Sequence, residues 1–159
     1  SDSFKATAII IQKMEILIVV FVLLSLIGSI SFLKPSKKMR ALSAIRHIAS
    51  KEGFKIGSTQ TLRQKFKNWT PQVAIYQIKN DSSFKDMHFV RVENTLTLYT
   101  PMSLKYDNQF PIIQKKILQL PNSVLEIIFF QSNIAIIWNE MQGHEELLKI
   151  KTAILNICN

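Results

Sequence analysis

The sequence has few of the residues that most often build a chemical site. Its 159 residues include one cysteine, Cys158, and four glycines. A single cysteine excludes an intrachain disulfide and a zinc site made of several cysteines, so we expect Cys158 to be a small core hydrophobe. Gly53 and Gly57 are the only two glycines close to each other, which is too few for a glycine-rich phosphate loop.

Candidate acid–base groups are also sparse. The histidines His47, His88 and His144 lie far apart, and no two have the spacing of a metal pair on one helix or strand. No two carboxylates stand at a defined spacing, as a general acid–base pair requires. Ser123 and Ser132 lack the glycine-containing turn that usually presents a nucleophile. The sequence therefore predicts no catalytic residue, no metal site and no cofactor.

Positive charge is concentrated in one segment. The formal net charge is +9, and residues 34–67 alone hold ten basic side chains against one acid, Glu52. Charges of the two signs balance in residues 1–33 and again in residues 68–159. We therefore expect an anionic partner at the basic segment, and the nearest one is a phospholipid head-group layer.

The residues before this basic segment are apolar, with no charge from Ile16 to Leu33. As a helix this run spans about 27 Å, close to the hydrocarbon thickness of a bilayer. A secretory signal needs a small-residue cleavage site after its apolar run, whereas Lys34 and further basic residues follow here. A buried core helix of this kind rarely fits so small a domain. We therefore predict a membrane-spanning helix over residues 16–33.

The charges beside the predicted span indicate its direction. Lys5 and Lys13 precede it, and a larger group of basic residues follows it. The positive-inside rule then places the N-terminus outside and the following domain in the cytoplasm, at an inner membrane or the equivalent organelle membrane. Residues 1–15 are an N-terminal flank. Because the chain opens without methionine and Met14 stands at the edge of the span, we interpret residues 1–13 as an extension, a processed end or a non-native leader.

Small residues lie in the second half of the predicted span, at Ser25, Gly28 and Ser29. Ser25 and Ser29 share a helix face, which favours close packing of a partner helix. The alternative is that serine and glycine are ordinary residues in such helices.

Two groups in the basic segment are candidate contact residues. The group next to the span is worth about 1 kcal/mol per residue against an anionic leaflet, or it only fixes topology; it consists of Lys34, Lys37, Lys38 and Arg40. The later group interleaves basic and aromatic side chains, as nucleic-acid-binding surfaces do; it consists of Arg63, Lys65, Lys67 and Trp69. This later stretch is short and no nucleic-acid-binding motif supports it. We therefore favour contact with a partner or a neighbouring subunit there, and regard nucleic acid as an unlikely ligand.

Periodicity predicts an α+β domain after the anchor. Residues 34–53 form a basic juxtamembrane amphipathic helix that Gly53 ends. The further expected elements are a strand with a loop at 54–68, strands at 72–79, 89–93 and 95–100, a helix at 111–120, a hairpin of 124–130 with 134–139, and a helix at 145–157. Both hairpin arms are apolar on both faces, which predicts a central position. Residues 54–159 are thus expected to form a small antiparallel sheet packed with about three helices, which lie against one face.

The exit from the span carries Leu33-Lys34-Pro35 with Lys37-Lys38, then a helix through Ser50-Lys51, then Gly53 with Ile56-Gly57. In these residues the stretch 16–60 resembles the YajC-type accessory subunit of the bacterial Sec translocon, which has one N-terminal span, a basic exit, a basic helix and a small cytoplasmic domain. The glycine-rich strand region of that family is missing here, and residues 70–159 have no counterpart in it. The resemblance implies an accessory role beside a larger membrane machine and carries over no functional residue.

These features predict a non-catalytic, single-span accessory or assembly subunit of a larger inner-membrane complex, with other subunits and anionic phospholipids as partners. The alternative is a membrane-tethered binding module that captures anionic lipid or nucleic acid through residues 34–67. An enzyme is a third hypothesis. It would need a pocket with converging polar groups, which the sequence does not indicate.

Overall fold

The computed structural model describes all residues from Ser1 to Asn159, which form two units, Ser1–Arg40 and Ala41–Asn159. The first unit contains one long helix, α1 (Asp2–Phe32), and none of its side chains is buried. This helix is long and apolar enough to cross a membrane. A secretory signal near an N-terminus has the same length and composition, so these two properties alone establish a candidate membrane segment.

Helix α1 begins much earlier than the predicted span, because the flank before Ile16 is rich in good helix formers and contains neither glycine nor proline. It ends at Phe32, with Leu33 as its C-terminal cap. Pro35 follows, and proline cannot continue a helix. The helical flank and the apolar run are therefore one continuous element.

The second unit alternates short helices and strands. Helix α2 (Lys37–Lys51) carries the end of the basic juxtamembrane segment into it. The later elements are β1 (Lys55–Ile56), α3 (Gln60–Lys65), β2 (Tyr76–Lys79), β3 (Met87–Val92), β4 (Thr95–Thr100), the 3₁₀ helix η1 (Met102–Tyr106), α4 (Phe110–Ile117), β5 (Val124–Phe129), β6 (Asn133–Trp138), the 3₁₀ helix η2 (Glu140–Gln142) and α5 (His144–Cys158). The predicted α+β class is confirmed.

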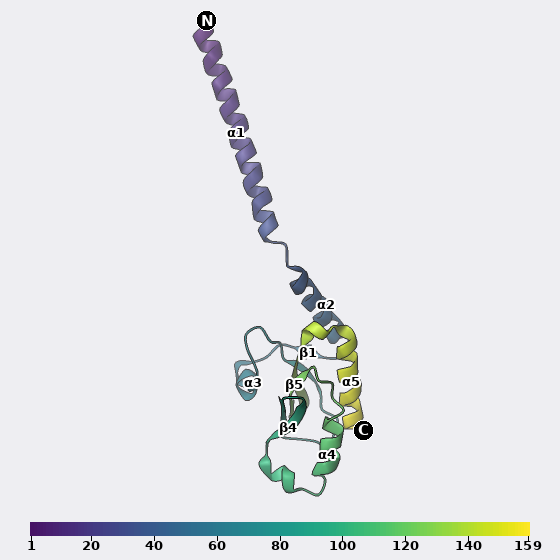
Figure 1. The fold of residues 1–159 in the computed structure, drawn as a ribbon. Helices are drawn as coiled ribbons and strands as arrows, with labels where there is room; N and C mark the ends of the chain where they lie inside the picture. Colours follow the sequence, from purple (N-terminus) through teal and green to yellow (C-terminus); the bar gives the residue numbers. More distant parts are fainter. The chain divides into compact units, whose positions relative to one another are not determined.

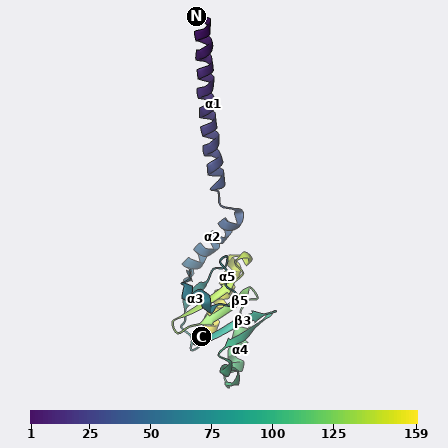
Figure 2. The ribbon, with the colours of Figure 1, turned by 90° about the vertical axis from the view of Figure 1, so that its left-hand side faces the viewer.

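All six strands form one antiparallel sheet in the order β1-β2-β6-β5-β3-β4. The hairpin of β5 and β6 is central, as its apolar arms predict, and five of the six β6 side chains are buried. The pair β1–β2 joins the hairpin on one side, and the pair β3–β4 joins it on the other. Figure 2 looks onto the sheet from the face that carries α3, with β3 and β5 running side by side.

Three helices cover one face of the sheet. Ile45 and Ala49 of α2 pack into the same core as Ile113 and Ile117 of α4 and the buried side chains of α5. Each of the leucine and isoleucine side chains among them contributes about 1.5–3 kcal/mol when fully buried. Figure 1 shows α4 and α5 on one side of the strands and α3 on the other.

The opposite face has its own, smaller apolar cluster, formed by Phe66, Ile75, Ile128, Ala135 and Ile137. The sequence predicts helices on one face only. The second face is covered instead by the chain between α3 and β2, which is mostly non-helical and therefore has no periodic signal. The sheet is thus buried on both sides at its centre.

The segment between α2 and β2 differs from its predicted form. Residues 54–68 hold a strand of only two residues and then helix α3, which Thr59 caps by accepting a hydrogen bond from the Leu62 amide at 3.3 Å. Strand β2 begins at Tyr76, later than predicted, because a turn with a 2.9 Å bond from the Val73 amide to the Thr70 carbonyl follows α3. Short capped helices of this kind are too brief for periodicity to reveal.

Candidate functional site

The domain buries two carboxylates, and each organises a polar network. Glu140 is 8% exposed and Glu126 is 0% exposed. A buried carboxylate is costly unless charge-assisted hydrogen bonds replace the water it has lost. The partners of these two side chains therefore show where the fold fixes its polar groups.

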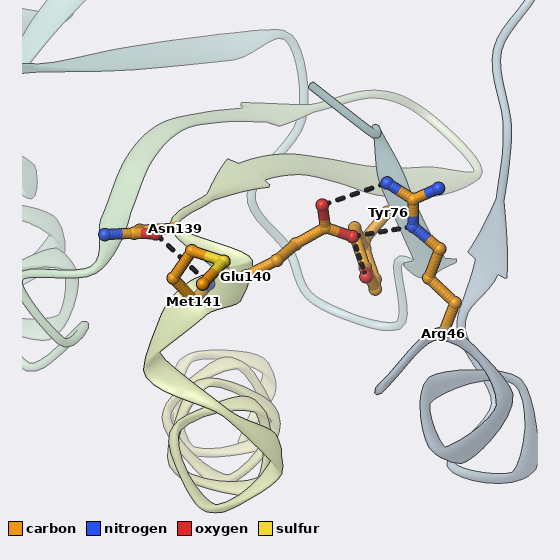
Figure 3. A network of polar contacts seen from close by, with 5 residues as sticks. All are labelled: Arg46, Tyr76, Asn139, Glu140 and Met141. Atoms are coloured by element: carbon orange, nitrogen blue, oxygen red, sulfur yellow. Dashed lines mark hydrogen bonds and ion pairs between the residues drawn. The ribbon is translucent and has the colours of Figure 1, made fainter. Parts of the chain in front are cut away.

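Glu140 joins α2, β2 and η2. The Arg46 Nε donates to its Oε1 at 2.8 Å and the Arg46 Nη2 donates to its Oε2 at 3.0 Å, while the Tyr76 hydroxyl donates to Oε1 at 2.5 Å. Figure 3 shows Arg46 and Tyr76 pointing toward this carboxylate, whereas Asn139 points away and accepts a 3.1 Å bond from the backbone amide of Met141. The bidentate pair locks the orientation of the guanidinium.

Two pKa values in this network are displaced. Burial of the phenol, and then its hydrogen bond to Glu140, raise the pKa of Tyr76 above its ordinary value. The hydrogen bonds to Glu140 raise the pKa of Arg46, against the opposing effect of burial. Both shifts favour the protonated forms that the geometry needs, so the network keeps its donors over the physiological pH range.

A cavity of about 410 Å³ opens beside this network. We call it the basic pocket, because Arg46 and Arg63 line it together with Trp69 and no acidic residue does. The remaining wall is apolar or neutral and consists of Ile56, Gly57, Ser58, Pro71, Gln72, Val73, Ala74 and Ile75. The pocket therefore combines fixed positive charge with an aromatic and aliphatic wall.

Arg63 is held in position although its side chain is exposed. Its Nε donates to the Ser58 hydroxyl at 2.7 Å, and its guanidinium carbon lies 5.0 Å from the ring centroid of Trp69. The two contacts come from opposite ends of α3, so the local fold of residues 58–69 sets the angle of this guanidinium. Its Nη1 and Nη2 groups make no hydrogen bond within the protein.

Glu126 forms the second network, on the face of the sheet that the chain after α3 covers. Its two oxygens accept the backbone amides of Lys67 and Asn68, each at 2.8 Å, and its Oε1 lies 2.6 Å from the Nε2 of His88. The carboxylate thus anchors the chain after α3 onto β5. A further cavity of about 360 Å³ adjoins His88 and is also lined by Lys65 and Tyr99.

The structure divides the predicted group around Arg63 between two places. Arg63 and Trp69 meet in the basic pocket. Lys65 lines the cavity beside His88, and the Lys67 ammonium lies 4.1 Å from the ring centroid of Tyr99. The four residues therefore do not form a single surface, because only Arg63 and Lys65 lie on α3, where they line different cavities, and Lys67 and Trp69 lie in the non-helical chain after it.

The other predicted site residues lie in the first unit. The juxtamembrane group of Lys34, Lys37, Lys38 and Arg40 is exposed throughout. Within α1, the hydroxyls of Ser25 and Ser29 each donate to a carbonyl four residues earlier, both at 2.8 Å, and Gly28 has open space around it. Both serines are therefore satisfied within their own helix, and the roles assigned to these two groups stay predictions.

The residues of the two networks are not among the predicted site residues: they are Arg46, Tyr76, His88, Glu126 and Glu140. One signal was present in the sequence. Glu126 interrupts an otherwise apolar strand that was expected to be covered on both faces, and a charged residue in such a strand needs buried partners. The identity of those partners depends on the sheet order, which local patterns do not reveal.

The charged side chains that remain available to a ligand in the basic pocket are cationic. Both buried carboxylates use their oxygens on internal donors, and histidine, cysteine and carboxylate side chains form no group of three that could hold a metal ion. Arg46, Arg63 and Trp69 instead present guanidinium groups beside an aromatic ring, a combination that recognises anions. Comparisons with protein-family models, curated proteins and solved structures find no match, so the likeness of residues 16–60 to the YajC-type subunit stays a prediction from the residues quoted above.

Proposed function

We propose that this protein is a non-catalytic, single-span accessory or assembly subunit of a larger inner-membrane complex, with its N-terminus outside and its α+β domain on the cytoplasmic side. The observation that carries the proposal is helix α1, whose 31 residues include no buried side chain. An apolar surface of this length needs lipid or partner helices around it. The domain after it has a complete core of its own, so α1 is available for anchoring.

The free edge of strand β4 supports a role in binding a partner. This strand ends the sheet, and its main chain makes no hydrogen bond beyond its ladder with β3. No charged residue occurs from Asn94 to Leu104, so the lysines that commonly protect a sheet edge are missing. The opposite edge strand, β1, has only two residues. We infer that an extended segment of a partner subunit adds to β4 as a further strand.

Isolation of the full-length protein from its native membrane tests this function. After solubilisation in a mild nonionic detergent, the protein should elute well above its monomer size and carry other membrane subunits with it. A monodisperse monomer under these conditions would contradict the proposal.

A charge on the β4 edge tests the docking surface. Thr97→Lys places a lysine on an exposed edge position and should reduce the recovery of co-purifying subunits, because a second strand cannot approach without burying the charge. Thr152→Lys, an equal change at an exposed position of α5, is the matched control and should leave recovery unchanged. Equal recovery with both variants would remove β4 from the docking surface.

A second candidate function is a membrane-tethered binding module that uses residues 34–67, favoured by the exposure of the juxtamembrane basic group. Reconstituted full-length protein should then bind anionic vesicles or oligonucleotides with a strong dependence on salt. Reversing the charges of Lys37, Lys38 and Arg40 should abolish that binding. Binding that is insensitive to salt or to these reversals would exclude this function.

A further inference from the structure

The basic pocket holds donor groups that the fold itself does not use. The Nε and Nη2 groups of Arg46 donate hydrogen bonds to Glu140, and its Nη1 group has no partner. Only the Nε group of Arg63 donates a hydrogen bond, to Ser58, and both of its Nη groups have no partner. Glu140 offsets the charge of Arg46, and no carboxylate faces Arg63. The pocket therefore keeps a net positive charge and several unpaired guanidinium donors.

We propose that the basic pocket binds a phosphate group, with Arg63 as the principal ligand, Arg46 as a second donor and Trp69 as the aromatic wall. Guanidinium groups present paired donors whose geometry matches the oxygens of a phosphate. Such a site lies beyond the proposed assembly function and does not depend on it.

Preorganisation is the strongest argument for this site. An exposed arginine normally loses side-chain conformational entropy when it binds an anion. In the basic pocket, Ser58 and the Trp69 ring already restrict Arg63, and the bidentate pair with Glu140 already restricts Arg46. Both guanidinium groups are thus oriented before a ligand arrives, which lowers the entropic cost of binding.

The volume and the lining of the pocket also suit a small phosphate compound. A volume of about 410 Å³ lies within the range of small-molecule sites, roughly 300–1,000 Å³. It exceeds the need of a bare phosphate ion, and its aliphatic wall, which includes Ile56 and Val73, suits an uncharged body attached to the phosphate. Two sources supply this chemistry: the head group of a phospholipid, which a membrane-tethered domain meets at high local concentration, and a soluble phosphate compound.

The two tryptophans provide a direct readout of binding. Trp69 lines the pocket, whereas Trp138 is 2% exposed and lies in the core against Tyr76. In ¹⁵N-labelled full-length protein, the indole signal of Trp69 should therefore move on titration while that of Trp138 stays in place. One arm titrates inorganic phosphate into protein held in nonionic detergent micelles. The other compares nanodiscs of phosphatidylcholine with nanodiscs that contain phosphatidylglycerol.

A matched pair of variants separates the pocket from general charge. Arg63→Gln should raise the half-saturating phosphate concentration about tenfold or more, the expected loss for a charge-assisted hydrogen bond. Lys65→Gln removes the same charge from the same helix outside the pocket and should change it by less than about twofold. Because both side chains are exposed, both variants are expected to keep the Trp138 signal of the folded domain.

The outcomes distinguish the sources and can overturn the site. Saturable movement of the Trp69 signal with inorganic phosphate supports a soluble phosphate ligand, and movement only in phosphatidylglycerol nanodiscs supports a lipid head group, provided that Arg63→Gln weakens either response. No movement with either probe overturns the proposal, and so does an equal effect of Arg63→Gln and Lys65→Gln. Saturation by polyglutamate but not by either phosphate probe also overturns it, because the site would then recognise carboxylates.

Discussion

Glu126 is a single residue on which several parts of the chain depend. Its oxygens accept two backbone amides after α3, and Oε1 also contacts His88 of β3. Glu126→Gln replaces one of these oxygens with a donor that faces a backbone N–H. We expect this change to lower the free energy of unfolding by about 1–3 kcal/mol, measured as a lower melting temperature of the full-length protein in nonionic detergent by near-ultraviolet circular dichroism.

The matched control removes a carboxylate that contacts its partner on the surface of the domain. Asp81 pairs with Lys79 at 2.6 Å on the surface, where water replaces the contact. Asp81→Asn should therefore leave the melting temperature unchanged. If Glu126→Gln and Asp81→Asn have equal effects, the Glu126 network does not contribute to stability as described.

Tyr76 gives the domain a specific response to alkaline pH. Its pKa is raised in the folded state, by burial and by the bond to Glu140, whereas tyrosine in the unfolded chain ionises near pH 10. Above about pH 10 the unfolded state binds fewer protons than the folded state, so this residue lowers stability as pH rises, with a slope of up to about 1.4 kcal/mol per pH unit. Tyr76→Phe should flatten that decline in unfolding experiments between about pH 8 and 11. Parallel curves for the two proteins would contradict the assignment.

Site residues that lie close together in the chain can be predicted from the sequence, whereas the partners in a long-range polar network cannot. Arg63 and Trp69 stand close together in the chain, and their contact follows from local structure alone. Arg46 and Glu140 are 94 positions apart, and their contact requires the correct placement of α2 against η2. Residue types and spacing can therefore predict a local contact such as that of Arg63 with Trp69, but they cannot predict a contact such as that of Arg46 with Glu140.

Among the elements, the turn that begins α5 depends on glycine. Gly143 has φ 87° and ψ −178°, a backbone conformation that is essentially restricted to glycine, and its amide donates to the carbonyl of Glu140 at 3.2 Å. Gly143→Ala meets no atom within 4 Å, so its cost comes from the backbone alone. We expect a loss of about 1–3 kcal/mol of stability, measured by the same melting experiment.

Gly28→Ala is the appropriate comparison, because Gly28 lies within α1 and has no positive φ. It should leave the melting of the α+β domain unchanged. If Gly143→Ala has the same melting temperature as the wild type, the end of η2 tolerates another backbone geometry. The glycine conformation would then not be needed to hold Glu140 in place.

Long or strongly patterned elements were predictable, and short ones were not. Helices α2 and α5 carry apolar periodicity and the β5–β6 hairpin consists of two apolar runs, and the predicted limits of all three lie within a few residues of the observed ones. Helix α3 has six residues and no buried side chain, so it offers no pattern. The order of the strands in the sheet cannot be predicted from the sequence either, because each apolar strand could pair with several different neighbours.

The direction in which the candidate membrane segment α1 would cross the bilayer can be tested directly. In a Cys158→Ser background, Ser3→Cys and Ser83→Cys each place one thiol at an exposed position, one before α1 and one in the domain. A membrane-impermeant maleimide applied to intact cells should label Cys at position 3 only, because the positive-inside rule places the domain in the cytoplasm.

Both positions should become labelled after lysis, which controls for thiol reactivity. Labelling of position 83 in intact cells would reverse the proposed topology. A mature protein from which position 3 has been removed would identify α1 as a cleaved signal sequence. The experiment thus separates the two elements that share this length and composition.

The sheet order has a consequence for how the chain is made. The first four strands form two pairs, and neither pair touches the other except through β5 and β6. A ribosome that has reached Asn122 has therefore synthesised α1 and both pairs, but neither of the strands that connect them. The two pairs therefore exist with unpaired edges until β5 and β6 have been made, and exposed strand edges of this kind favour misassociation. Synthesis of the last quarter of the chain is thus the step that supplies the two strands on which the whole sheet depends.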